Sequence, residues 1–154
     1  MLDLKLMDYA AGLKVQARDG KKKVWDPVRK QWVALLPEEF VRQLTLAYLI
    51  QERGYPASAL AVEKTLRGHH LKKRCDIVAF SIRSNPFLLI ECKAPDITLG
   101  TEVFLQAANY NLALQVPFLM MTNGQQSYCC HLDYQGRQIN DLPEVPGYPA
   151  APRI

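Results

Sequence analysis

The 154-residue chain lacks any apolar run close to the ~20 residues that a membrane-spanning helix requires. Its first residues, MLDLKLMDYAAG, contain acidic side chains and have no basic stretch followed by an apolar segment. That pattern is not a secretory signal, because such signals begin with positive charge and continue with an uninterrupted apolar core. We therefore expect no membrane partner and a cytoplasmic location.

The cysteines lack the spacing of a metal site. The chain has four, and Cys75, Cys92, Cys129 and Cys130 form no C-x-x-C pair. A structural zinc site is therefore excluded, and His69-His70 are interpreted as loop residues. Without a secretory signal, reduced thiols are favoured over disulfides.

The sequence also lacks internal repeats and the G-x-x-x-x-G-K-[ST] loop of ATP-driven motors, so it encodes no ATPase of that type. What it has is ordinary globular composition, with 49% hydrophobic and 22% charged residues. The net charge of +4 permits a nucleic-acid partner without requiring one. We expect a stand-alone single domain.

The order of predicted elements indicates an α/β fold, at the border of α+β, with a mixed central sheet flanked by helices. An N-terminal β-hairpin precedes it, since Asp19-Gly20 separates two strand-like runs. A helix begins at Pro37, where proline and two acids suit the first turn. The predicted elements are strands 13–17, 23–25 and 31–35, helix 37–53, a short strand 60–62, a basic connection 69–74, strands 75–82 and 86–92, helix 101–114, and strands 116–122 and 127–132.

Three segments follow from this order. Residues 1–36 form the N-terminal hairpin extension, residues 37–135 form the core, and residues 136–154 form a proline-rich tail. The prolines of the tail predict an extended and loosely held segment.

The hairpin formed by strands 75–82 and 86–92 carries the chemistry. If Ser81 pairs with Pro86, Asp76 faces Glu91 across the two strands. Lys93 lies two residues beyond Glu91 and shares its face. The same register opposes Cys75 and Cys92 on the other face, where we expect reduced thiols packed under a helix.

Two adjacent carboxylates repel each other when ionised, and a divalent cation between them removes that repulsion. Mg²⁺ suits such oxygen ligands, with Mn²⁺ as a substitute, and a neighbouring lysine can orient water or stabilise charge on a phosphate. The arrangement is the outline of a phosphodiester-cleaving site. The spacing alone favours a solvated cross-strand charge cluster, because an acid two residues before a lysine also occurs at Asp3-Leu4-Lys5.

The combination of Asp76 with the run Pro86-Phe-Leu-Leu-Ile-Glu91-Cys92-Lys93 resembles the signature of the PD-(D/E)XK nuclease superfamily, with Cys75 where that signature has proline. Several further blocks, in order over roughly residues 10–132, resemble the N-terminal nuclease domain of type I restriction enzyme motor (R) subunits. These blocks are Asp26-Pro27-Val28-Arg29, Pro37-Glu38-Glu39-Phe40-Val41-Arg42-Gln43, Lys73-Arg74-Cys75-Asp76-Ile77, Ile90-Glu91-Cys92-Lys93-Ala94-Pro95, Gln106-Ala107-Ala108-Asn109-Tyr110-Asn111 and Thr122-Asn123-Gly124. The resemblance implies a restriction-endonuclease-like fold and Mg²⁺-dependent DNA cleavage.

The resemblance also implies roles for single residues. Asp76 and Glu91 hold the metal and Lys93 serves the attacking water. Glu39 is an additional acid near the metal, although the helix dipole explains an acid at that position equally well. Gln106 and Tyr110, four residues apart on one helix face, contact DNA or support the site, or they form a polar edge of a core helix.

Basic residues between the short strand and the hairpin are candidate phosphate contacts. Lys73 and Arg74 lead this set, with Lys72, Arg29 and Lys30 beside them, and a solvated face explains them nearly as well. Glu63 is interpreted as a strand-end charge.

These inferences favour a metal-dependent DNA endonuclease tied to restriction or repair. The alternative is a catalytically silent module with a nuclease-like fold that binds nucleic acid or protein. Type I motor subunits continue into a translocase that this sequence lacks, so we expect a homodimer or a separate targeting or motor protein to direct it to DNA.

Overall fold

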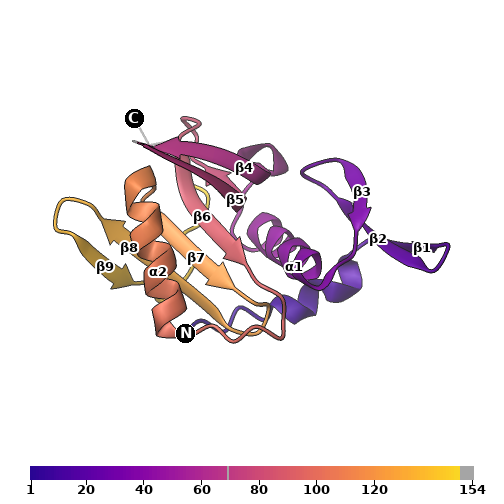
Figure 1. The fold of residues 1–154 in the computed structure, drawn as a ribbon. Coiled ribbons are helices and arrows are strands. Elements are labelled where there is room, and N and C mark those ends of the chain that lie inside the picture. The colour runs from indigo at the N-terminus through magenta and orange to yellow at the C-terminus, as the bar shows by residue number, and fades with distance from the viewer. Residues whose placement is uncertain (69, 150–154) are drawn as a thin grey trace.

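Two separate β-sheets organise the part of the chain that the computed structural model describes, residues 1–68 and 70–149. The smaller sheet is antiparallel and has the order β1-β2-β3, with β1 at Val15–Arg18, β2 at Lys21–Asp26 and β3 at Gln31–Ala34. Asp19 and Gly20 have φ of 54° and 73°, the left-handed values that a two-residue hairpin turn needs. The predicted N-terminal hairpin is therefore confirmed, and it projects from the body (Figure 1).

The larger sheet has six strands in the order β4-β5-β6-β7-β8-β9. Every neighbouring pair is antiparallel except β6 and β7, so the sheet is mixed as predicted. The parallel pair requires a crossover, and α2 supplies it. The strands are β4 at Leu60–Gly68, β5 at Leu71–Phe80, β6 at Pro86–Cys92, β7 at Phe118–Thr122, β8 at Ser127–Asp133 and β9 at Gln138–Asp141.

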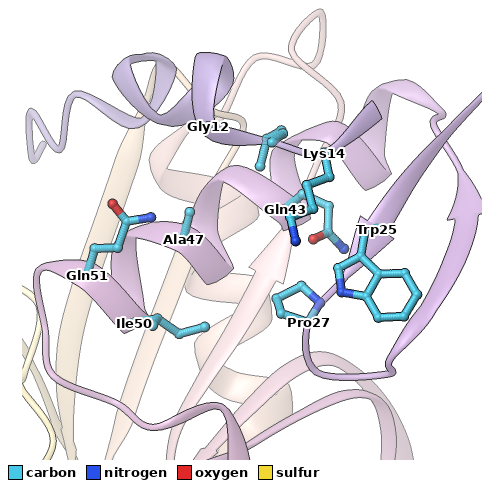
Figure 2. A pocket seen from close by; sticks show the side chains of 9 residues that line it. Gly12, Lys14, Trp25, Pro27, Gln43, Ala47, Ile50 and Gln51 are labelled. Atoms are coloured by element: carbon cyan, nitrogen blue, oxygen red, sulfur yellow. The ribbon is translucent and has the colours of Figure 1, made fainter. Parts of the chain in front are cut away.

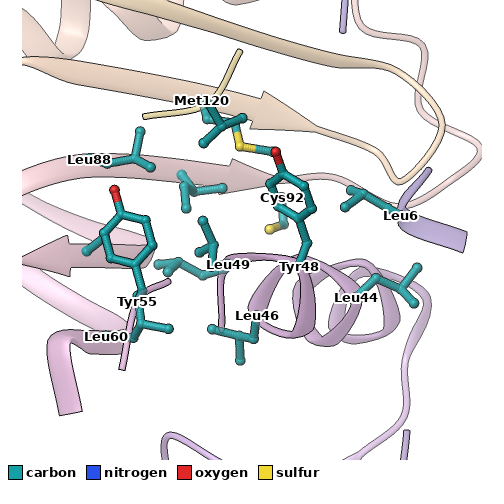
Figure 3. Close-up of a cluster of buried hydrophobic side chains, with 14 of the residues drawn as sticks. Leu6, Leu44, Leu46, Tyr48, Leu49, Tyr55, Leu60, Leu88, Cys92 and Met120 are labelled. Atoms are coloured by element: carbon teal, nitrogen blue, oxygen red, sulfur yellow. The ribbon is translucent and has the colours of Figure 1, made fainter. Parts of the chain in front are cut away.

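The sheet is covered on both faces. Helix α1, Pro37–Gln51, buries Leu44, Leu46 and Leu49 in a cluster that includes Leu88 and Cys92 of β6 (Figure 3). Helix α2, Thr101–Asn111, buries its own side chains in a second cluster against other residues of the sheet. Short 3-10 segments complete the fold: η1 at Leu6–Gly12, η2 at Ala57–Ala59 and η3 at Leu112–Leu114. No helix in the described residues is both long and apolar enough to cross a membrane.

The prediction of a basic connection over residues 69–74 was wrong for its described strand residues, and residue 69 lies outside the described part of the chain. Leu71–Arg74 belong to β5, which pairs with β4 along most of its length. The error arose because lysines and arginines occupy this part of the strand, so the local sequence lacks apolar alternation and the strand exists through its pairing.

The predicted register between β5 and β6 holds in the middle of the hairpin and fails at both ends. Ile77 pairs with Ile90 as expected, but near the turn Phe80 pairs with Pro86 because the register shifts after Ala79. Cys75 packs in the cluster on the α2 side and Cys92 in the cluster on the α1 side. The prediction that these two cysteines oppose each other on one face was therefore wrong.

The reason lies at Asp76. In a regular strand, residues two apart share a face, yet Cys75 and Ile77 pack in different clusters. Glu63 of β4 lies opposite Asp76 and has a left-handed φ of 54°. The residues on either side of Glu63 and Asp76 pair across the two strands, but Glu63 and Asp76 do not pair with each other. The distortion of β4 and β5 turns Asp76 away from the regular alternation.

The segment after residue 135 is held more firmly than its prolines predict. Gln138–Asp141 form β9 at the edge of the six-stranded sheet, so the sheet extends past the expected end of the core. Val145 is fully buried with the α1-side cluster, and the Tyr55 hydroxyl donates to the Pro146 carbonyl at 2.8 Å. Residues 150–154, the end of the predicted tail, lie outside the described residues.

All four cysteines are buried and free. Burial raises the pKa of Cys75 to about 11 and the pKa values of Cys129 and Cys130 to about 12. Because the thiolate is the reactive form, we expect slow alkylation of the native protein at pH 8 and four titratable thiols after denaturation without reductant. A count of two or fewer in the denatured protein would contradict this expectation.

Candidate metal and nuclease site

Asp76 and Glu91 lie together where β5 and β6 separate. The ladder ends at the pair Ile77–Ile90, and beyond it the Cys92 backbone N–H donates to Asp76 Oδ2 at 2.8 Å. The carboxylate of Asp76 thus replaces a backbone partner directly beside Glu91. The two acids are neighbours as predicted, although they are not ladder partners.

Each carboxylate also contacts a basic side chain of the chain itself. Lys73 Nζ lies 2.6 Å from Glu91 Oε1, with both side chains largely buried. Arg42 Nη2 lies 3.4 Å from Asp76 Oδ1. The predicted phosphate contact Lys73 therefore serves as an internal ion-pair partner of a predicted metal ligand.

The surroundings of Glu91 disfavour the ionised form of its carboxyl group. Burial raises its pKa above the ordinary value of 4.5, the negative charge of Asp76 raises it further, and Lys73 opposes both effects. Buried carboxylates whose pKa is raised by a second acid are typical of sites that bind cations or transfer protons.

This shift has a consequence for stability. A carboxyl group with a raised pKa in the folded state stabilises fully below its unfolded pKa of about 4.5, and that contribution is lost as pH rises through the folded pKa. We expect the free energy of unfolding of the wild type to fall relative to that of Glu91→Gln as pH increases from 4 to 8 in EDTA. Urea denaturation at each pH measures the difference, and parallel profiles for the two proteins would contradict it.

Lys93 is positioned by the sheet while its ammonium group makes no ion pair within the described residues. Its backbone N–H donates to the Thr122 carbonyl at 2.9 Å, which fixes the residue just beyond β6. A surface pocket is lined by Lys93 together with Glu91, Lys73 and Gln106. The structure therefore brings Gln106 of α2 to the candidate site, whereas the side chain of Tyr110 lies outside the described part of the chain.

Glu39 does not join Asp76 and Glu91 as a third acid of one cluster. It is buried in the first turn of α1, where it accepts hydrogen bonds from Arg29, Arg42 and Gln43. Among the residues that the structure describes, no group of three or more acidic, cysteine or histidine side chains is placed to hold a metal ion. A direct metal contact by Glu39 stays a prediction that this arrangement does not favour.

A network of ion pairs surrounds Asp76, and sequence reasoning did not find its central residue, Arg42. Arg42 Nη1 lies 2.8 Å from Glu39 Oε1, and its Nη2 contacts Asp76. The signal was present, because Glu39 and Arg42 are three residues apart in a predicted helix. Arg29 is bound to Asp26 and Glu39 and is only 17% exposed, so it is not a free phosphate contact.

Glu63 and Arg74 form the outer part of the same network. Arg74 Nη2 lies 2.8 Å from Glu63 Oε1, and Arg74 itself remains exposed. Burial opposes ionisation of Glu63, but the hydrogen bond from Arg74 and the charges of Arg42 and Arg29 outweigh it and lower the pKa of Glu63. Glu63 is thus more than a strand-end charge, since it orders basic side chains beside Asp76.

The donor set fits a hard divalent cation. Mg²⁺ binds through one or two carboxylates together with water and substrate phosphate, and it does not need a complete protein cage. Asp76 and Glu91 provide two carboxylates, and burial together with the negative charge of Asp76 raises the pKa of Glu91 despite its ion pair with Lys73. A cation at this position requires Lys73, a long and flexible side chain, to withdraw from Glu91.

Comparison with known proteins now adds the family. Residues 37–146, well over half of the chain, match the family model of the type I restriction enzyme R protein N terminus (HSDR_N). The chain belongs to this family. No curated protein matches the sequence.

The fold of this HSDR_N family member is similar to a solved structure. The match is a fragment described as an HsdR subunit of a type I restriction enzyme from Vibrio vulnificus YJ016, with a TM-score of 0.52 and 21% sequence identity. It covers 73% of this chain and 24% of the other chain, so the chain spans about a quarter of the length of that relative. The similarity confirms the expected mixed α/β fold, and the family match begins at Pro37, the first residue of α1.

Proposed function

We propose that this HSDR_N family member is a Mg²⁺-dependent DNA endonuclease domain of the PD-(D/E)XK type, acting in restriction. One observation carries the proposal: at the open end of one hairpin, Asp76 accepts the N–H of the residue after Glu91, and Glu91 lines a pocket together with Lys93. The family adds support, because its name places it in type I restriction enzymes.

The chain's own residues divide the chemistry between them. Asp76 and Glu91 hold Mg²⁺, which supplies positive charge at the scissile phosphate when bound. Lys93 orients the attacking water and stabilises the negative charge that develops on the phosphate. Arg42 keeps the Asp76 side chain oriented through its contact at 3.4 Å. Gln106, on the rim of the same pocket, contacts the DNA backbone.

A second candidate is a catalytically silent binding module. Two ion pairs support this candidate: Lys73 with Glu91 and Arg42 with Asp76. They neutralise both carboxylates within the chain. The two candidates differ in whether a divalent cation can displace Lys73. Recruitment to DNA by a separate motor or targeting protein, or by a homodimer, is compatible with both.

Binding of the metal should be visible as thermal stabilisation. A ligand that binds only the folded state at a hundred times its Kd adds ~2.7 kcal/mol. For a chain of this size that corresponds to a rise in Tm of about 5–10 °C. We expect Mg²⁺ or Mn²⁺ to produce this rise in the wild type and not in Asp76→Asn or Glu91→Gln.

Glu102→Gln is the matched control, because Glu102 is an exposed acid in the first turn of α2. It should retain the full metal-induced rise in Tm. Equal rises in Asp76→Asn and in the wild type would refute the assignment of the metal site and favour the silent module.

A further inference from the structure

The three-stranded sheet that precedes the matched family region carries the positive charge of the molecule. Residues 14–34 contain seven basic and two acidic side chains, a net charge of +5, whereas the whole chain has a net charge of +4. The remaining residues are therefore slightly negative in sum. We call β1, β2 and β3 with Lys14 the N-terminal arm.

The basic residues of the N-terminal arm are sorted by face. Arg18 pairs with Lys21, Trp25 pairs with Trp32, and the Trp25 N–H donates to the Lys14 carbonyl at 2.9 Å. Cross-strand partners point to the same face, as do residues two apart on a strand. One face of the arm therefore presents Lys14, Arg18, Lys21, Lys23, Trp25 and Trp32.

The opposite face has a different character. Val24 and Asp26 lie on it and are fully buried, and Lys22 is its one basic residue between the turn and Val24. Lys21, Lys22 and Lys23 are all exposed neighbours in β2, yet only Lys21 and Lys23 belong to the basic and aromatic face.

The tip of the arm is a two-stranded ribbon. Strand β3 pairs with Lys23–Asp26 only, so the segment from Ala17 through Lys22 extends past it (Figure 1). The major groove of duplex DNA, ~12 Å wide, admits a two-stranded β-ribbon. Lysine and arginine at such a tip provide the phosphate contacts that dominate affinity for DNA.

The root of the arm is attached to the helix that carries the network at Asp76. Lys14 and Trp25 line a pocket of about 280 Å³ together with Gln43 and Ala47 of α1 (Figure 2). Gln43 also donates to Asp26 Oδ2 at 3.0 Å, and Arg29 joins the arm to Glu39. A duplex held by the arm is therefore held by an element fixed to the candidate site.

We infer that the N-terminal arm is a duplex-DNA binding element whose basic and aromatic face grips the phosphate backbone. This inference rests on the proposed function in one respect: the DNA that the arm holds is the DNA that the candidate site cuts. The charge of the arm, its ribbon tip and its position outside the matched family region are independent of metal binding and cleavage.

The experiment measures binding of the intact chain to a fluorescein-labelled duplex in EDTA over a range of salt concentrations. Each phosphate contact contributes about −0.9 to the slope of log K against log salt. We expect Lys21→Gln/Lys23→Gln to make that slope less negative by about 1.8. Lys22→Gln, on the opposite face, should leave it unchanged, as should Arg83→Gln/Arg137→Gln, which removes two exposed charges from other turns.

A second readout comes from the wild type. The chain has two tryptophans, and both lie on the proposed face. Duplex binding should therefore change the intrinsic tryptophan emission, in parallel with the anisotropy of the labelled DNA.

Four results would overturn the inference. They are an unchanged slope in Lys21→Gln/Lys23→Gln, a change of slope in Lys22→Gln as large per removed charge as in that double variant, unaltered tryptophan emission on binding, and binding to anionic vesicles but not to the duplex. None depends on cleavage. DNA binding through the arm in a protein that never cuts DNA would refute the proposed function and leave the arm assignment standing.

Discussion

Replacing Lys93 by alanine should lower the rate of Mg²⁺-dependent duplex cleavage by roughly 10²–10³-fold, the scale seen when one preorganised electrostatic group is lost. The structure leaves the Lys93 ammonium without an ion pair among the described residues and sets it in a pocket with Glu91. In the proposed role, Lys93 interacts with the attacking water and with the charge that develops in the transition state. Loss of such an interaction lowers the rate with little change in affinity, so DNA binding should stay within a few-fold.

Single-turnover cleavage and equilibrium binding of the same duplex measure the two quantities separately. Lys64→Ala is the control, because Lys64 is an exposed lysine of β4 outside the candidate site. Its cleavage rate should match that of the wild type. A loss of binding in Lys93→Ala equal to its loss of rate would show that Lys93 binds substrate rather than stabilising the transition state.

The second large effect is expected on stability. Arg42→Met should lower the free energy of unfolding by about 3–5 kcal/mol, since removing one partner of a buried ion pair leaves the others uncompensated. The Arg42 side chain is 6% exposed and contacts Glu39 at 2.8 Å and Asp76 at 3.4 Å. Methionine keeps much of the volume, so the loss reflects charge rather than a cavity.

Urea denaturation with a fixed m-value measures this change, and the corresponding fall in Tm is roughly 6–20 °C. Arg83→Met, at an exposed turn, serves as the control and should change stability by less than about 0.5 kcal/mol. A similarly small change in Arg42→Met would show that the network does not support the fold around Asp76.

The sequence predicts those parts of the fold that depend on local signals. The Asp19-Gly20 turn, the start of α1 at Pro37, the apolar half of β5 from Cys75 and the apolar strand β6 all follow from residues next to one another in the chain. Strand β9 was missed because Gln138–Asp141 is a polar, largely exposed edge strand without apolar alternation. The 3-10 segment η1 was missed as well, since its buried Leu6 packs against the cluster under α1 rather than following a helical period.

For the candidate site, too, the sequence predicts what depends on local signals and misses what depends on tertiary contacts. Asp76 and Glu91 are neighbours as predicted, but through the hydrogen bond from the Cys92 N–H to Asp76 and not through the predicted pairing of the two residues. The ion pairs of Lys73 and Arg42 with these acids could not be predicted, because they join elements far apart in the sequence through tertiary packing. The face of Cys75 was predicted wrongly because the distortion at Asp76 depends on the left-handed φ of Glu63 on the neighbouring strand.

Conversion of supercoiled plasmid to nicked and linear forms by the purified chain, in Mg²⁺ or Mn²⁺ against EDTA, tests the central claim most directly. We expect cleavage by the wild type in either metal, none in EDTA, and none by Asp76→Asn or Glu91→Gln, with Glu102→Gln unaffected. Cleavage that persists in Asp76→Asn and Glu91→Gln would contradict the assigned site. An intact plasmid under every condition, with the wild type folded and binding duplex DNA, would contradict the endonuclease and establish the silent module in its place.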